Sequence, residues 1–467
     1  MESDYFVKGC GAMAMAFVDV MLRETDATFT LVDKRAAPGG HWNDAYPFVR
    51  LHQPSASYGV ASRALGHLRK DAWGFNAGYY ELASGVEVAD YFHQVMRDVF
   101  LPTGRVSYHP MSEVVGEEAA NAEFVSLLSG ERRTVAIKKK FVDATLLQTS
   151  IPLTHTRKFE VAPGVACIPP NDLTRVAPKH THFTVLGAGK TAIDSVVWLL
   201  ANGARPESIT WVLPRDPWLI NRAYVQPGDD FFEQGIGALA IQNEVAASAT
   251  SIRDFCEKMA ANRIWLRLDD SVWPTMMHGA TVNLAELEQL RRVGRFVRKQ
   301  RVRRLESGRM ILDDATIDAH ADELYVDCTA RALAANVHDR RPVFSPGLIR
   351  LQMIRQYQPT FSAALIGHIE AAYADEAQKE SLAQVAPMTD TVEDWIAMMV
   401  VSMKNQSNWS SDKELFNWIA NCRLDLYSGA ARRVRPDEVS KQAVIAKMRE
   451  YAGPAVRNFY KLAKGVG

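Results

Sequence analysis

The chain has 467 residues, of which 47% are hydrophobic and 23% are charged. This length and composition indicate a globular protein with two domains and part of a third. The 54 basic and 54 acidic residues cancel to a formal net charge of +0. We therefore expect neither nucleic acid nor an anionic membrane as a partner.

The cysteines and the amino terminus indicate the compartment. Five cysteines are scattered along the chain without any Cys-x-x-Cys pair: Cys10, Cys167, Cys256, Cys328 and Cys422. This pattern is typical of a reducing compartment and argues against a zinc site or a disulfide-reductase centre. No apolar stretch is long enough to cross a bilayer, and a strand-like run begins where a signal peptide would stand. We expect a cytoplasmic protein without a metal site.

A first glycine turn lies at residues 9–14, between a strand-like run and an apolar helical run. Gly9 permits the tight turn, and Gly11 lets backbone N–H groups approach a pyrophosphate. Ala14 supplies the small third residue, and the following helix directs its positive dipole end toward the phosphates. The next strand ends in Asp33, roughly 20 residues later, where a carboxylate accepts hydrogen bonds from a ribose diol. The segment predicts a dinucleotide site.

A second turn of the same type lies at residues 187–192. Its candidate cofactor-binding residues are Gly187, Gly189, Lys190 and Thr191. The strand that follows ends in Arg215 instead of an acid, and an arginine holds a 2′-phosphate through two charge-assisted hydrogen bonds. The second site is therefore predicted to bind NADPH, with Lys190 and Arg222 as rival cations. An ATPase loop is excluded because Thr184 stands where that motif needs a glycine.

The segment after Asp33 carries a longer pattern. It contains Gly39, Gly40, His41 and Trp42, followed by Tyr46-Pro47 and Arg50. This run resembles the Gly-Gly-x-Trp and Tyr-Pro-x-x-Arg segment of the flavin-dependent monooxygenases, a class that includes Baeyer–Villiger and N-hydroxylating enzymes. The resemblance covers residues 4–62 and 183–215, and it implies that residues 39–42 wrap an FAD. The Phe-x-Gly-x-x-x-His signature of the class is missing from residues 159–171.

Residues around this segment would shape the flavin environment. Arg50, His52 and Gln53 are our candidate catalytic residues, placed to tune the flavin ring; a structural hydrogen bond to backbone is the alternative for His52. Lys8 occupies an apolar strand position directly before the first turn. A buried lysine without a partner is costly, so Lys8 is the residue most expected to endanger FAD binding.

The expected fold class is α/β, with two Rossmann-like dinucleotide-binding domains, the second inserted in the first, and a helical C-terminal region. The predicted order is an FAD-binding domain (1–150), a linker (151–178), an NADPH-binding domain (179–330) with a substrate-side insertion at about 216–300, the second part of the FAD-binding domain (331–380) and a helical cap (381–467). Similar segments around Asp143 and Asp327 look like the strands that return to each nucleotide domain. Helices are predicted at 392–403, 413–421 and 438–464, where they cap the pocket or form a homodimer face.

The sequence therefore predicts an FAD-dependent, NADPH-consuming oxidoreductase. Its expected reaction is a monooxygenation through a flavin C4a-hydroperoxide, acting on a small, partly apolar organic molecule. A flavin dehydrogenase or reductase without oxygen insertion would leave the same sequence pattern. A protein that has lost FAD and acts as a non-redox enzyme or binding protein, and a plain NADPH dehydrogenase, stay open as well.

Overall fold

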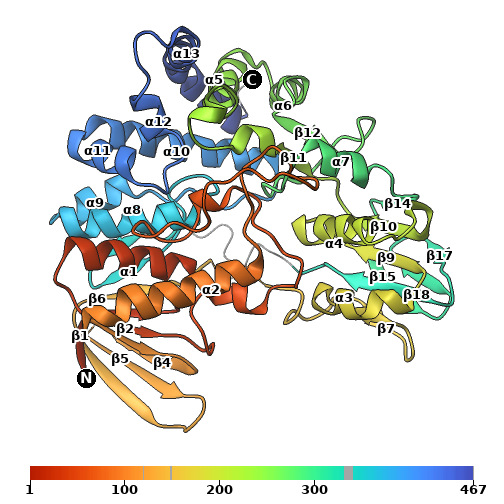
Figure 1. Cartoon of the computed structure of the whole chain (residues 1–467), viewed down its shortest axis with the longest axis horizontal. Helices are drawn as coiled ribbons and strands as arrows, with labels where there is room; N and C mark the ends of the chain where they lie inside the picture. The colour runs from red at the N-terminus through yellow and green to blue at the C-terminus, as the bar shows by residue number, and fades with distance from the viewer. Residues whose placement is uncertain (119, 148–149, 331–339, 466–467) are drawn as a thin grey trace.

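A mixed, mainly parallel sheet, a second sheet that is fully parallel and a group of helices form the framework of the chain (Figure 1). The structure is a computed structural model that describes residues 1–118, 120–147, 150–330 and 340–465. The predicted boundary at residue 331 therefore lies outside the described residues. Within the described residues, no helix has both the length and the apolar character needed to cross a membrane.

The first unit is built on an eight-stranded sheet with the parallel order β20-β6-β1-β2-β3. These strands are β1 (Glu2–Lys8), β2 (Phe29–Val32), β3 (Val106–His109), β6 (Arg132–Asp143) and β20 (Leu348–Arg350). Three antiparallel strands complete the sheet: β4 (Ser112–Glu118), β5 (Asn121–Ser126) and β19 (Phe344–Ser345). Tyr5, Phe6 and Val7 are all buried because both faces of β1 are covered.

Helices α1 (Ala12–Glu24) and α8 (Pro359–Ala372) pack side by side on this sheet, and α2 (Gly85–Val95) lies near them (Figure 1). The two helices approach closely at Gly367, where a Cβ atom would lie 3.0 Å from the carbonyl oxygen of Phe17. The carboxyl end of β6 pairs with β1, and β20 pairs with the same stretch of β6 at Leu348 and Phe141. The chain thus leaves the first sheet after Asp143 and returns to it much later.

The second unit is built on five parallel strands in the order β14-β10-β9-β18-β8. These are β8 (Cys167–Ile168), β9 (His182–Leu186), β10 (Ile209–Leu213), β14 (Arg295–Arg298) and β18 (Glu323–Asp327). Helices α3 (Leu173–Val176), α4 (Lys190–Ala201) and α7 (Leu284–Leu290) accompany this sheet. A small sheet of β7 (Glu160–Val161), β15 (Val302–Glu306), β16 (Arg309–Leu312) and β17 (Thr316–Asp318) shares an apolar core with it.

Two predicted boundaries differ from the structure. The segment 151–178 is only partly a linker, because β8 within it pairs with β18 of the second sheet. The insertion ends before residue 300, because β14 already pairs with β10. Both strands are short, and strand pairing of this kind depends on partners distant in sequence.

The third unit combines the insertion with the carboxyl-terminal region. The insertion contributes β11 (Trp218–Asn221), α5 (Phe232–Ser248), α6 (Ile252–Ala261), β12 (Trp265–Arg267) and β13 (Thr281–Val282). The C-terminal helices are α9 (Glu376–Leu382), α10 (Val392–Ser411), α11 (Lys413–Asn421), α12 (Ser428–Arg432) and α13 (Val439–Ala463). In Figure 1, α5, α6 and α13 lie together at the top of the molecule.

The insertion's aromatic residues belong mainly to a core. Trp218 and Trp265 are fully or almost fully buried, and the rings of Trp265 and Trp395 meet edge to face with centroids 4.9 Å apart. Phe255 packs in the same way against Phe459 of α13. The aromatic residues of the insertion therefore mainly form the hydrophobic core between the insertion and the C-terminal helices, since large aromatic rings bury the most apolar area.

Candidate functional site

A cavity of about 1020 Å³ lies where the three units meet. Its wall includes Gly9 and Gly11 of the first turn and Gly187 and Gly189 of the second. The turns follow β1 and β9, so both stand at carboxyl ends of parallel strands, the edge at which α/β sheets bind ligands. Pockets for single drug-sized ligands measure roughly 300–1,000 Å³, so this cavity has room for more than one such group.

The first turn is formed by closely approaching backbones. Gly9 has a φ of +92°, and a Cβ atom there would lie 3.0 Å from the methyl group of Thr145. Gly40 has a φ of +61°, and a Cβ atom there would lie 2.9 Å from Cα of Gly11. Gly11 and Gly39 also form an isolated parallel bridge. Only glycine fits this contact without displacing the turn.

Two predicted binding residues lie behind the cavity wall. Ala14 is fully buried in α1, where its small side chain lets the helix pack on the sheet. Gly39 has a φ of +107° and approaches Phe92 of α2. These residues shape the turn through backbone packing, whereas Gly40, His41 and Trp42 line the cavity directly.

Asp33 is the acid at the end of β2. Its carboxylate accepts hydrogen bonds from the backbone N–H groups of Cys10 at 2.6 Å and Arg35 at 2.8 Å. Each oxygen keeps a further lone pair, and Asp33 lines the cavity, so a diol can still donate to it. Cys10 itself is fully buried, and burial followed by the charge of Asp33 raises the pKa of its thiol well above the usual value. A nucleophilic role for this cysteine is thereby disfavoured.

The environment of Lys8 differs from the predicted one, in which this lysine is buried without a partner. The side chain is 31% exposed and forms an ion pair with Glu117 of β4, while it also lines the cavity. The predicted cost of a buried lysine without a partner does not arise. Lys8 instead brings a positive charge to the wall beside the first turn.

The ring pair of His41 and Trp42 forms the wall next to Gly40. The two rings stack with centroids 5.3 Å apart, and the indole N–H of Trp42 donates to the hydroxyl of Tyr58 at 2.8 Å. Loss of hydration inside the concave wall, followed by the charge of Arg35, lowers the pKa of His41 to about 4. The imidazole is therefore neutral at pH 7.

The second turn repeats the first in its packing. Gly187 has a φ of +118°, and a Cβ atom there would lie 2.5 Å from the carbonyl oxygen of Cys328. A Cβ atom at Gly189 would meet no atom within 4 Å, so this position is open toward the cavity. Thr191 lies in the first turn of α4 and lines the same wall.

The segments that cross behind the two turns are also alike. Thr145 donates from its backbone N–H and its hydroxyl to Oδ1 of Asp143, at 2.9 and 2.6 Å. Thr329 donates in the same way to Oδ1 of Asp327, at 3.0 and 2.6 Å. The predicted similarity of these segments therefore extends to their hydrogen bonds.

A polar network connects the two units next to the second turn. Lys190 forms an ion pair with Asp194 one helical turn later. The other carboxylate oxygen of Asp194 accepts a hydrogen bond of 2.7 Å from the hydroxyl of Tyr46. Burial, followed by the charge of Asp194, raises the pKa of Tyr46 well above its usual value. The phenol therefore stays protonated and acts as a donor.

Arg215 lines the cavity and is already engaged. Its guanidinium donates to both carboxylate oxygens of Asp390, at 3.1 and 2.6 Å, and Nε2 of His278 lies 2.7 Å from the same carboxylate. The hydrogen bond from Arg215 holds the pKa of Asp390 well below its usual range. The rival cation Arg222 is only 1% exposed, pairs with Glu286 at 2.8 Å and does not line the cavity.

The three predicted catalytic residues all line the cavity. Arg50 donates to the carbonyl oxygen of Leu82 at 3.0 Å, which ties it to the segment before α2. The backbone carbonyl of His52 accepts from Nε of Arg222 at 3.2 Å. Burial and the charges of Lys190 and Arg222 lower the pKa of His52 well below its usual value, so the ring is neutral at pH 7. Gln53 is half-buried beside it.

Some residues of the cavity wall were not among the predicted site residues: Tyr46, Arg301, Tyr357 and Asp390. Tyr46 stands in the Tyr-Pro pair of the monooxygenase-like segment, and Arg301 in a run of basic residues, so each had a local signal. Asp390 had none, because its partner Arg215 lies 175 residues away.

Comparisons with known proteins give relatives along the whole chain. No protein-family model matches the chain. The uncharacterized protein Rv2000 of Mycobacterium tuberculosis is 40% identical over 462 residues, covering 99% of this chain and 84% of the relative, and the uncharacterized protein Mb2023 of Mycobacterium bovis matches equally. An oxidized steroid monooxygenase bound to NADP has a similar structure, with a TM-score of 0.51 at 14% identity over 79% of this chain and 85% of that chain. The predicted resemblance to the flavoprotein monooxygenases is thus confirmed at the level of the fold, and the chain belongs to the family of these two mycobacterial proteins.

Proposed function

We propose that the chain is a flavoprotein oxidoreductase that binds FAD at the first glycine turn and NADPH at the second. The observation that carries the proposal is the shared cavity, into which both turns open. Hydride transfer needs the two reacting rings in contact and correctly oriented. Two dinucleotides bound in one cavity can satisfy that requirement, whereas two separate pockets could not.

The residues of the first turn fit an FAD. Gly11 and Gly40 leave the backbone free of side chains at the point where a pyrophosphate would approach. Asp33 has lone pairs for a ribose diol, and Lys8 supplies a positive charge beside the phosphates. When bound, FAD would supply the electron transfer and the reaction with oxygen, and the protein would bind, orient and keep water away.

Selection for NADPH would depend on Arg215. Its two parallel N–H groups now face Asp390, and a 2′-phosphate offers the same geometry with more negative charge. The phosphate would therefore compete with Asp390 for the arginine. Arg301 lies on the same wall as a second cation.

The proposed substrate is a small, partly apolar organic molecule, and the proposed reaction is a monooxygenation. Apolar and aromatic side chains from the insertion and from the segment 353–388 line part of the cavity: Met276, Met353, Tyr357, Val385 and Met388. The neutral ring of His52, which also lines the cavity, can accept a hydrogen bond from an N–H or O–H group of the substrate. This combination suits an apolar molecule with one reactive nitrogen, sulfur or carbonyl group.

The test is an anaerobic titration of the purified protein with NADPH, followed by oxygen. We expect a yellow protein whose flavin absorbance is bleached by NADPH and restored by oxygen. Incubation with ¹⁸O₂ and a panel of small amines, thioethers and ketones should give a product that carries one labelled atom. Release of hydrogen peroxide alone with every panel member would indicate a reductase. A colourless protein that cannot be reconstituted with FAD would contradict flavin binding altogether.

A further inference from the structure

A group of histidine and acidic side chains lies at the edge of the second sheet opposite the glycine turn. His182 begins β9 and pairs in register with Glu323, which begins β18. Strands rise about 3.3 Å per residue, so His182 is about 16 Å from Gly187 at the other end of β9. The group is therefore separate from the cavity and from the proposed redox function.

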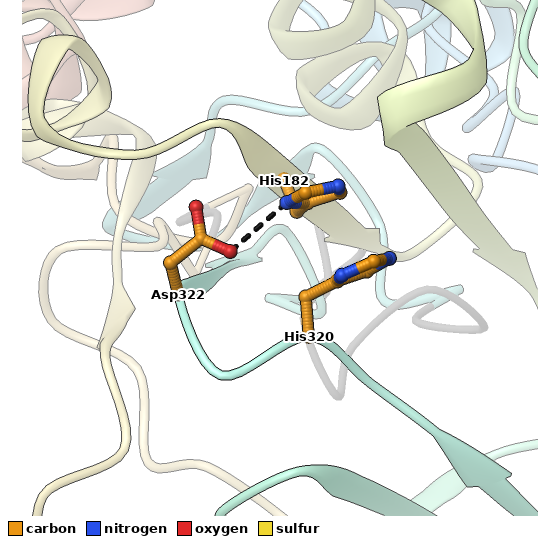
Figure 2. Close-up of side chains that lie close together, drawn as sticks. All are labelled: His182, His320 and Asp322. Carbon is orange, nitrogen blue, oxygen red and sulfur yellow. Dashed lines mark hydrogen bonds and ion pairs between the residues drawn. The ribbon is translucent and has the colours of Figure 1, made fainter.

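Figure 2 shows how His182, His320 and Asp322 converge. The two imidazole rings stack face to face, with centroids 3.5 Å apart and an interplanar angle of 9°. Oδ1 of Asp322 lies 2.9 Å from Nδ1 of His182. One nitrogen from each histidine and one carboxylate oxygen all lie within 4.8 Å of one another.

The surrounding backbone holds Asp322 in place. The backbone N–H and the hydroxyl of Thr181 donate to Oδ2 of Asp322, at 2.9 and 2.6 Å. Nδ1 of His180 lies 2.6 Å from the backbone carbonyl oxygen of Asp322 and donates to it. With Oδ2 and the backbone occupied in this way, Oδ1 is directed toward the two rings (Figure 2).

This donor set suits a transition-metal ion. Two imidazole nitrogens and one carboxylate oxygen are ligands that Zn²⁺ accepts, and imidazole favours Zn²⁺, Ni²⁺ or Cu²⁺ over Mg²⁺ and Ca²⁺. With bonds of about 2.1 Å, donor atoms around a tetrahedral zinc lie about 3.4 Å apart, so the donor atoms must approach one another by about 1 Å. Because an imidazole nitrogen binds a metal in the plane of its ring, the exposed ring of His320 must also rotate out of the stack with His182. His320 and Asp322 are exposed, which leaves room for water as the fourth ligand.

We propose that His182, His320 and Asp322 form a surface site for a divalent transition-metal ion, with Zn²⁺ as the ion to test. The ion would join the start of β9 to the segment that leads into β18. Neither the cysteine pattern nor the nucleotide-binding motifs indicate this site. It is formed by His182 at the start of β9 and by the His-x-Asp sequence of His320 and Asp322 directly before the neighbouring strand β18.

The experiment is a calorimetric titration of the full chain with ZnCl₂ after EDTA treatment and desalting. We expect one Zn²⁺ per chain at this site. His320→Ala removes one of three protein ligands from an exposed position and should weaken binding by about tenfold or more, and Asp322→Asn should weaken it as well. His93→Ala, at an exposed histidine of α2 outside the group, is the matched control and should bind like the wild type.

A second readout separates loss of ligands from loss of structure. Co²⁺ should give visible absorption bands of a nitrogen and oxygen site with the wild type and with His93→Ala, and much weaker bands with His320→Ala. Circular dichroism should be the same for all three proteins, since His320 is exposed. Absence of Zn²⁺ binding by the wild type, or equal affinity in a folded His320→Ala, would overturn the proposal.

Discussion

The hydroxyl of Tyr46 donates a hydrogen bond of 2.7 Å to the carboxylate of Asp194, although the two residues lie 148 positions apart. Tyr46 follows the glycine pair of the first unit, and Asp194 lies in α4, the helix that begins at the second glycine turn. Asp194 also holds Lys190. This contact therefore connects the two candidate cofactor sites directly. Through the shared carboxylate of Asp194, Tyr46 of the first site also helps to hold Lys190 of the second site in place.

Tyr46→Phe should destabilise the chain by about 2 kcal/mol, because a buried hydrogen bond to a charged group is lost. The apparent KM for NADPH should rise as well, since Lys190 loses its fixed neighbour. Urea unfolding and steady-state kinetics measure the two effects. Tyr108→Phe is the matched control: the buried hydroxyl of Tyr108 has no hydrogen-bond partner among the described residues, so its removal should leave stability unchanged. Equal losses in both variants would contradict the assigned role.

Arg215→Ala should weaken NADPH binding by about 30-fold, which corresponds to about 2 kcal/mol for charge-assisted hydrogen bonds to a phosphate. NADH binding should change much less, because NADH lacks the 2′-phosphate. Stopped-flow measurement of flavin reduction with both nucleotides gives the two dissociation constants. Arg304→Ala, which removes an exposed arginine paired with Glu160 on the small sheet, serves as the control. An equal loss of affinity for NADPH and NADH would show that Arg215 does not determine the preference for NADPH.

Asp390→Asn tests whether the carboxylate of Asp390 and the 2′-phosphate of NADPH compete for Arg215. The neutral amide no longer holds the guanidinium with a full charge, so the arginine becomes more available and NADPH should bind more tightly than to the wild type. The same nucleotide titrations measure this change. Weaker NADPH binding in Asp390→Asn would indicate that Asp390 positions Arg215 for the phosphate instead of competing with it.

Gly40→Ala should abolish retention of FAD. The added Cβ would lie 2.9 Å from Cα of Gly11 at a positive φ, so the two segments of the first turn must separate. The flavin absorbance of the purified protein measures retention. Gly237→Ala in α5 is the control, because a Cβ atom there meets no neighbour within 4 Å and alanine favours a helix. A Gly40→Ala protein that purifies as yellow as the control would place FAD elsewhere.

His52 should make stability depend on pH. Its pKa in the folded chain is lowered well below the usual value of about 6.5, so the unfolded state binds the proton more readily. The contribution of the neutral His52 ring to the free energy of unfolding is fully present above pH 6.5, and it is lost as the pH falls below that value. Urea midpoints at pH 7.5 and 5.5 should therefore differ less for His52→Gln than for the wild type. His93→Gln should behave like the wild type, and an unchanged pH dependence in His52→Gln would contradict the assignment.

Local sequence determined the parts of the site that depend on a few neighbouring residues. The turns at Gly9 and Gly187 have the left-handed φ values that their glycines predict, and Asp33 ends β2 as expected. Helix α11 has its predicted bounds because the Asp412 side chain accepts from the N–H groups of Glu414 and Leu415 and so caps the first turn. Such features need no distant partner, so a pattern of residue types is enough to predict them.

Tertiary structure alone decided which charges and rings have partners. Lys8 is paired with Glu117 and Arg215 with Asp390, and Trp265 packs on Trp395 in a core instead of lining a pocket. The physical reason is the same in each case. Burial and ion pairing depend on segments that meet only when the chain has folded, and the spacing of residues in the sequence does not predict such contacts. The pairing of Tyr46 with Asp194 and the convergence of His182, His320 and Asp322 belong to this second class, and both lie at places where separate strands and helices come together.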